Sequence, residues 1–316
     1  MGSIQIVDDR QSLPSSVEGT VASIGVFDGV HRGHQKLLGL VTNEAESKSI
    51  PSVVITFDQH PTQITSPENA PKILTPLGKK IQLLEELGID YVYVLSFDKE
   101  RASTPATQFI QEIFVDAVRA KSIYIGEDFQ FGYKRSGNVE LLESEGKSLD
   151  IDVNGIKLFK SDSIDQGQVS STVIRKHLEL GEIELANEKL GRSYECTGIV
   201  VSGDKRGREI GFPTANININ ESIATPADGV YAAWYHFADE EKKPSAVNIG
   251  KRPTFSTGEE KSVIEAHILD FDGDLYGDAA TLVFEKRIRS EIKFAGLEAL
   301  QHQLEKDLSE IRSILS

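Results

Sequence analysis

The strongest constraint on the fold of this chain is a change in hydrophobic period along its length. Over residues 20–160, short β-rich runs alternate with amphipathic helical segments. The predicted strands are 21–27, 52–57, 91–97 and 122–126, and the predicted helices are 34–48, 77–87 and 105–118. This alternation predicts an α/β domain with a doubly wound parallel sheet, whose ligands sit beyond the carboxyl ends of the strands.

After Tyr194 the sequence changes to closely spaced strand-like runs separated by turn-rich pieces. The predicted strands are 194–202, 229–237, 245–248, 262–269 and 281–288, and the predicted turns are 203–204, 226–229, 239–244 and 270–277. This spacing predicts a small antiparallel β-barrel, followed by a C-terminal helix over 297–315. Two short helical segments near 171–180 and 182–190 form the predicted seam, so we expect domains of residues 1–185 and 186–316.

Composition narrows the classes of partner. The net charge of −15 argues against general nucleic-acid affinity and against anionic membranes. The single cysteine, Cys196, excludes an intrachain disulfide and a zinc cluster of thiolates. The sequence has no apolar run long enough for a membrane span, and residues 1–10 lack the features of a signal peptide. We therefore expect a cytoplasmic protein with small-molecule partners, and a homo-oligomer stays open.

The run from Gly25 to His34 is the first candidate site. A strand ends at Phe27, a tight Asp28-Gly29 turn follows, and a helix begins with free N–H groups and a partial positive charge. His31 and His34 lie three residues apart, where imidazoles can donate hydrogen bonds to the charge that builds on a triphosphate. We predict nucleoside triphosphate binding and nucleotidyl transfer. Two surface histidines at an ordinary junction, or a metal-binding pair, are the alternatives.

The glycine-rich run from Gly203 to Asn216 is the second candidate site. Thr214 and Asn216 are oxygen donors that point to one side of an extended chain, where they could hold Mg²⁺ beside a phosphate. The loop before them offers backbone N–H groups and cations for phosphate, and its candidate residues are Gly203, Lys205, Gly207, Arg208, Gly211 and Pro213.

Glu265, on the predicted strand 262–269, is a candidate general base for a substrate hydroxyl. Alternation along that strand by itself favours a solvent-facing glutamate without a chemical role.

The first half resembles the N-terminal domain of bacterial bifunctional FAD synthetases, within the nucleotidyltransferase superfamily. Residues 25–34 are similar to its His-x-Gly-His signature, and the further matching segments are 56–61, 126–132, 135–138 and 170–175. The resemblance implies that His31, His34 and the Ser-Ser-Thr-x-x-Arg motif bind ATP phosphates. It places the nucleotide-binding residues at Gly25, Phe27, Asp28, Gly29, Asp128, Ser171, Thr172 and Arg175. Taken alone, the last motif is typical of a plain helix cap with a surface arginine.

The second half resembles riboflavin kinase. The matching segments are 203–216, 226–231, 247–255 and 265–277. The resemblance assigns Thr214 and Asn216 to Mg–ATP and Glu265 to the general base. Arg289, Lys293 and Phe294 are similar to a region that closes over flavin.

Together the two resemblances imply an ATP- and Mg²⁺-dependent enzyme that converts riboflavin to FMN and FMN to FAD. Two positions depart from the family pattern. Asp128 stands where relatives often carry asparagine, and residues 165–169 contain no cation before Ser170. One alternative is therefore a riboflavin kinase with an impaired or inactive adenylyltransferase domain. Another is a flavin-binding sensor or carrier without chemistry.

Overall fold

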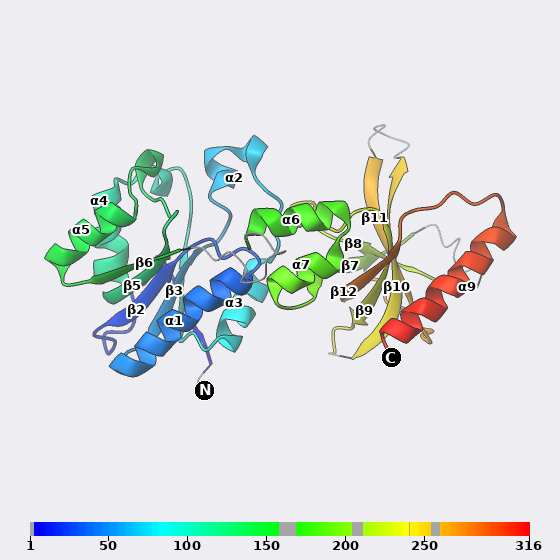
Figure 1. Ribbon diagram of the computed structural model, residues 1–316, viewed down its shortest axis with the longest axis horizontal. Coiled ribbons are helices and arrows are strands. Elements are labelled where there is room, and N and C mark those ends of the chain that lie inside the picture. The colour runs from blue at the N-terminus through cyan, green and yellow to red at the C-terminus, as the bar shows by residue number, and fades with distance from the viewer. Residues whose placement is uncertain (1–2, 158–168, 204–210, 240, 254–259) are drawn as a thin grey trace. The chain divides into compact units, whose positions relative to one another are not determined.

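A computed structural model describes residues 3–157, 169–203, 211–239, 241–253 and 260–316 (Figure 1). The chain forms two compact units, Met1–Ser171 and Thr172–Ser316. The predicted domain boundary between residues 185 and 186 stays a prediction.

The first unit contains a six-stranded sheet in the order β1-β4-β3-β2-β5-β6, and every pairing in it is parallel. Its strands are β1 (Gln5–Asp8), β2 (Thr20–Ile24), β3 (Ser52–Phe57), β4 (Tyr91–Leu95), β5 (Ala120–Gly126) and β6 (Asp152–Ile156). The predicted doubly wound parallel sheet is confirmed. The chain runs from β2 through β3 to β4 on one side and returns to β5 on the other side of β2. The topological switch point therefore lies between β2 and β5.

Helices cover both faces of this sheet (Figure 1). They are α1 (Arg32–Lys48), α3 (Leu77–Glu86), α4 (Ala106–Phe109), the π-helix η3 (Ile110–Ala117) and α5 (Val139–Leu149), while the short helix α2 (Thr62–Thr65) buries none of its residues. The short 3₁₀ turns are η1 (Pro67–Asn69), η2 (Arg101–Ser103) and η4 (Tyr133–Arg135). As predicted, α1 buries Leu37, Leu38, Val41 and Ala45 along one stripe. With α3 it packs on one face, while α4, η3 and α5 pack on the other.

The edge strands β1 and β6, and helix α5, were not predicted. β1 is short and exposes Ile6 to solvent, so it lacks the continuous apolar run of a buried strand. β6 contains Asn154 and Gly155, residues that β-strands disfavour. Each strand forms because a buried neighbour offers a free edge, which only the tertiary structure supplies.

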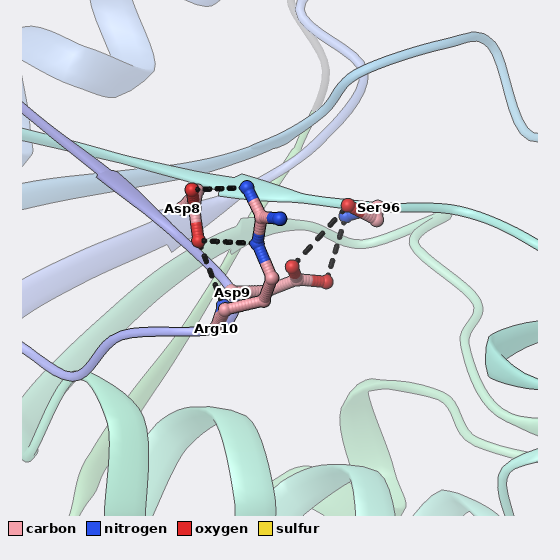
Figure 2. Close-up of polar contacts among 4 residues, drawn as sticks. All are labelled: Asp8, Asp9, Arg10 and Ser96. Carbon is pink, nitrogen blue, oxygen red and sulfur yellow. Dashed lines mark hydrogen bonds and ion pairs between the residues drawn. The ribbon is translucent and has the colours of Figure 1, made fainter.

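Polar contacts of Asp8, Asp9 and Arg10 hold the carboxyl end of β1 in place (Figure 2). The Asp9 carboxylate accepts hydrogen bonds from the backbone N–H and the hydroxyl of Ser96, at 2.8 and 3.2 Å. Arg10 turns back onto Asp8, with 2.9 Å between Nη2 and Oδ2, and its hydrogen bonds lower the pKa of the Asp8 carboxyl. The Asp9–Ser96 hydrogen bonds connect this part of the chain to the segment that follows β4, whereas the Arg10–Asp8 contacts are local.

The second unit is a closed antiparallel barrel in the strand order β10-β11-β8-β7-β12-β9. Its strands are β7 (Tyr194–Val201), β8 (Ala215–Asn218), β9 (Gly229–His236), β10 (Lys242–Pro253), β11 (Glu260–Ile268) and β12 (Ala279–Arg289). The predicted barrel is confirmed. β8 was not predicted, because its sequence is short and polar. β10 begins at Lys242, inside the predicted turn 239–244, because its pairing with β9 extends to His236.

In the part of the second unit that the structure describes, the helices are α6 (Ser171–Leu180, whose first residue closes the first unit), α7 (Ile183–Leu190) and α9 (Leu297–Ile314). Arg287 of β12 holds the end of α6, because its guanidinium donates to the carbonyl of Leu180 at 3.3 Å and to that of Asp228 at 2.7 Å. A Cβ at Gly181 would lie 2.7 Å from this guanidinium, and Gly181 has φ +72°, so glycine fits both demands. The predicted C-terminal helix is confirmed as α9, which packs Ile311 on the barrel.

Candidate active sites

The first candidate site is the turn that follows β2 at the switch point of the sheet. The backbone takes left-handed φ values at Phe27 (+49°), Gly29 (+86°) and Val30 (+39°). The positive φ of Val30 is energetically unfavourable, because a β-branched side chain clashes with its own backbone in this conformation. Strain of this kind persists where the surroundings fix the conformation, and it concentrates at functional sites. Gln35 contributes to fixing it, because its side-chain amide donates to the Val30 carbonyl at 2.8 Å.

The structure brings the two predicted histidines into contact. His31 is the N-cap of α1 and only 3% exposed, and its Nδ1 accepts a hydrogen bond from the backbone N–H of His34 at 3.3 Å. The two imidazole rings stack, with centroids 3.6 Å apart and planes 14° apart. The ring of Phe27 meets His34 edge-on at 5.2 Å.

His34 is held as a neutral imidazole. Burial, followed by the positive fields of His31 and Lys80, lowers its pKa well below the usual value. Its Nδ1 is buried and has no hydrogen-bond partner in the part of the chain that the structure describes. A neutral ring can donate one hydrogen bond to an anion and places no charge against the stacked ring of His31. Over the same described residues, no group of three or more His, Cys, Asp or Glu side chains could hold a metal ion.

Asp28 uses its carboxylate inside the protein. The side chain is 4% exposed, and it accepts hydrogen bonds from the backbone N–H groups of Leu74 (2.9 Å) and Thr75 (3.0 Å). Its backbone carbonyl accepts the hydroxyl hydrogen of Ser171 at 2.8 Å. The structure therefore places Ser171 at the turn, while the Asp28 side chain fixes the loop before α3. A nucleotide contact by Asp28 stays a prediction.

The other predicted residues of this site lie near the same strand ends or begin the second unit. Gly25 continues β2, because its N–H donates to the carbonyl of Ile55 at 3.1 Å. Asp128 is exposed in the turn that follows β5, the strand beside β2. Thr172 and Arg175 lie on α6, at the start of the second unit.

Sequence reasoning missed Lys80, which lies on the buried side of α3 at 5% exposure. Its ammonium donates to the carbonyl of Val26 at 2.7 Å and to the hydroxyl of Thr56 at 3.2 Å. The sequence contained a signal for the burial of Lys80, because it shares a helical stripe with Leu83, Leu84 and Leu87. A lysine is rarely buried at such a position unless it is paired with other polar groups.

The second candidate site lies across three strands of the barrel. Glu265 on β11 pairs directly with Asn216 on β8 and with Asn248 on β10. Directly opposite residues of antiparallel strands point to the same face, so these three side chains form a row. Their neighbours Ile264 and Ala266 are buried and point to the other face, into the barrel. The register thus brings the predicted base and a predicted Mg²⁺ ligand together.

Two contacts position the segment that enters β8. His267, two residues after Glu265, places its Nδ1 2.7 Å from the carbonyl oxygen of Pro213, and its ring meets Phe212 edge-on at 5.8 Å. A Cβ at Gly203 would collide with the side chain of Asn216, so a larger residue there would displace that amide from its position. Thr214 is exposed beside this segment. Gly211 lies there with φ +88°, whereas Lys205, Gly207 and Arg208 lie outside the described residues.

The predicted flavin-closing region is connected to the last helix. Arg289 forms an ion pair with Asp307 of α9, with distances of 2.9 Å from Nε and 2.8 Å from Nη2 to Oδ2. The guanidinium also lies over the ring of Phe294, at 5.7 Å from its centroid. Its role toward flavin stays a prediction.

The chain combines a doubly wound sheet, which has a histidine pair at its switch point, with a six-stranded barrel that carries a Glu–Asn row. This combination is the arrangement expected of a two-domain transferase. Comparison with known families agrees. The FAD synthetase model matches residues 13–173, and the riboflavin kinase model matches residues 190–315. This chain therefore belongs to the family of bifunctional riboflavin kinase/FMN adenylyltransferases, as its sequence resemblance predicted.

Relatives and a solved structure match over nearly the whole chain. The bifunctional riboflavin kinase/FMN adenylyltransferase of Escherichia coli K12 is 37% identical over 92% of this chain and 91% of its own length. The protein of the same name from Bacillus subtilis 168 is 37% identical, covering 98% and 97%. A Streptococcus pneumoniae crystal structure described as a macrolide-efflux protein aligns with a TM-score of 0.86 at 30% identity, covering 98% and 99%. None of the helices in the described residues is both long and apolar enough to span a bilayer.

Proposed function

We propose that this chain phosphorylates riboflavin to FMN and adenylylates FMN to FAD, using ATP in both steps. The observation that carries the proposal is the match of both family models, each to one half of the chain. The alternative of riboflavin kinase alone is not favoured, because the FAD synthetase half is present and its histidine pair is assembled. A sensor or carrier has no need of that pair or of the Glu265 row.

In the kinase step, the riboflavin 5′-hydroxyl oxygen attacks the γ-phosphorus of ATP, and ADP leaves. Glu265 accepts the hydroxyl proton, which its place on the exposed face of β11 allows. Thr214 and Asn216 fit a Mg²⁺ site, since both carry side-chain oxygen donors and the strand register sets Asn216 opposite Glu265. The ion, when bound there, would draw negative charge from the phosphates.

In the adenylyl step, a phosphate oxygen of FMN attacks the α-phosphorus of a second ATP, and pyrophosphate leaves. The attacking phosphate is already an anion, so the protein needs no nucleophile of its own. We propose that His31, His34, Ser171, Thr172 and Arg175 bind the triphosphate. Hydrogen bonds from such groups matter most where charge develops in the transition state. The cytoplasmic location, the oligomeric state and the absence of nucleic-acid and membrane partners stay predictions.

Product analysis tests the proposal directly. The purified chain is incubated with ATP and Mg²⁺, in one reaction with riboflavin and in a second with FMN, and the flavins are separated by chromatography. We expect FMN and then FAD in the first reaction and FAD in the second. FMN accumulating without FAD would return the protein to the kinase-only alternative, and unchanged riboflavin would contradict the kinase assignment.

A further inference from the structure

A buried lysine lies at the start of the strained turn in the first unit. Lys80 of α3 is 5% exposed, and its ammonium reaches the carbonyl of Val26 and the hydroxyl of Thr56. The Thr56 hydroxyl, itself fully buried, donates to the same Val26 carbonyl at 3.2 Å. Lys80 thereby connects the carboxyl ends of β2 and β3 through two neutral acceptors.

Burying an ammonium is expensive, so its position needs a compensating reason. Burial lowers the pKa of Lys80 to about 8, partly offset by the field of Asp28. If a carboxylate contacted the Lys80 ammonium directly, the two groups would form an ordinary buried ion pair. Here the ammonium instead donates to a backbone carbonyl oxygen and a hydroxyl oxygen at the start of the turn.

The same short segment holds the turn at a second point. Leu74 and Thr75, just before α3, donate to the Asp28 carboxylate. Between the two fixed points lies Phe27, with φ +49°, and its ring contacts His34. Residues 74–80 therefore fix the backbone on both sides of the residue against which His34 packs.

We propose that Lys80 is a positioning residue for adenylyl transfer, acting by holding Val26 and Thr56 so that the turn presents His34 to the triphosphate. The inference rests on the proposed adenylyl transfer at the first site. A misplacement of about 1 Å at a catalytic group costs roughly 100-fold in rate. Lys80 itself does not contact the substrate in this proposal.

The test compares Lys80→Met with Lys99→Met, which removes an exposed lysine of the same unit. For Lys80→Met we expect kcat for FMN adenylylation to fall about 10- to 100-fold, with KM for FMN unchanged. Riboflavin phosphorylation by the same molecules should stay at the wild-type rate, and Lys99→Met should match wild type in both reactions. A folded Lys80→Met protein with wild-type adenylylation would overturn the inference. Wild type that makes no FAD would instead contradict the proposed function.

The pH profile supplies a readout that a purely structural role would not move. Among the described residues, the ionisable groups whose fields couple to Lys80 are Asp28 of the turn and His34 of α1. As pH rises through about 8, the ammonium is lost, so wild-type adenylylation should decline relative to phosphorylation. Lys80→Met should lack this decline, and the same decline in that variant would count against Lys80.

Should Lys80→Met fail to fold, as thermal unfolding would reveal, Thr56→Val replaces it. This change keeps the ammonium and the side-chain volume but removes the hydroxyl that Lys80 contacts. We expect kcat for FMN adenylylation to fall below the wild-type value while riboflavin phosphorylation stays at the wild-type rate. Unchanged adenylylation in a folded Thr56→Val protein would overturn the inference.

Discussion

Glu44 of α1 shows how one side chain organises the surface between α1 and β5. Its carboxylate pairs with Lys48 at 2.6 Å and accepts hydrogen bonds from the hydroxyls of Ser122, at 2.5 Å, and Tyr124. Burial raises the pKa of Glu44, but the hydrogen bonds from Lys48, Ser122 and Tyr124 outweigh it and lower the pKa to about 2. The charged form is therefore favoured by folding.

The pH dependence of stability follows from this shift. The folded pKa of Glu44 lies below the unfolded value of 4.5, so its contribution is complete above pH 4.5 and is lost as pH falls through about 2. We expect Glu44→Gln to flatten the loss of stability in acid, measured by urea unfolding from pH 6 downward. Glu46→Gln, which changes an exposed neighbour, should retain the wild-type slope. Parallel slopes for wild type and Glu44→Gln would contradict the assignment.

At the scale of elements, α9 is fastened to the barrel by one buried ion pair. Asp307 is 3% exposed and binds Arg289 of β12, and its second oxygen accepts from Gln303 at 2.7 Å. A second ion pair of α9, between Arg312 and Asp270, lies in solvent. The two pairs are chemically alike but differ in burial, which decides how much each contributes.

Removing one partner of the buried pair leaves the other charge uncompensated. We expect Asp307→Ala to destabilise the second unit by about 3–5 kcal/mol. Arg312→Ala should leave the unfolding midpoint of the second unit unchanged, since water screens an exposed ion pair. Chemical denaturation followed by the fluorescence of Trp234, the single tryptophan, reports on this unit. Equal effects of the two substitutions would refute the distinction between them.

At the scale of the whole molecule, the two reactions are assigned to separate sets of side chains. The histidine pair lies on α1 of the first unit, and the Glu265 row lies on the barrel. Substitution at one site should therefore spare the reaction at the other, provided that both units stay folded.

We expect His34→Ala to lower FMN adenylylation about 100- to 1000-fold, as for other transition-state hydrogen-bond donors. Glu265→Gln should lower riboflavin phosphorylation about 100- to 10,000-fold, the usual contribution of a general base. Each variant serves as the control for the other, with riboflavin and FMN supplied in separate assays. The assignment of the two reactions to separate sites would be wrong if either substitution reduced both reactions equally.

The sequence by itself determined the two architectures and the positions of both motifs. Continuous apolar runs such as 52–57 and the stripe of Leu37, Leu38 and Val41 follow from local periodicity, which the chain carries wherever it folds. Only the tertiary structure decided the contacts between distant segments. It added β1, β6 and β8 as strands, turned the Asp28 carboxylate toward Leu74 and Thr75, and buried Lys80 against Val26. It also set Asn216 opposite Glu265. Pairing register and burial depend on residues far apart in the chain, and periodicity within one segment carries no information about them.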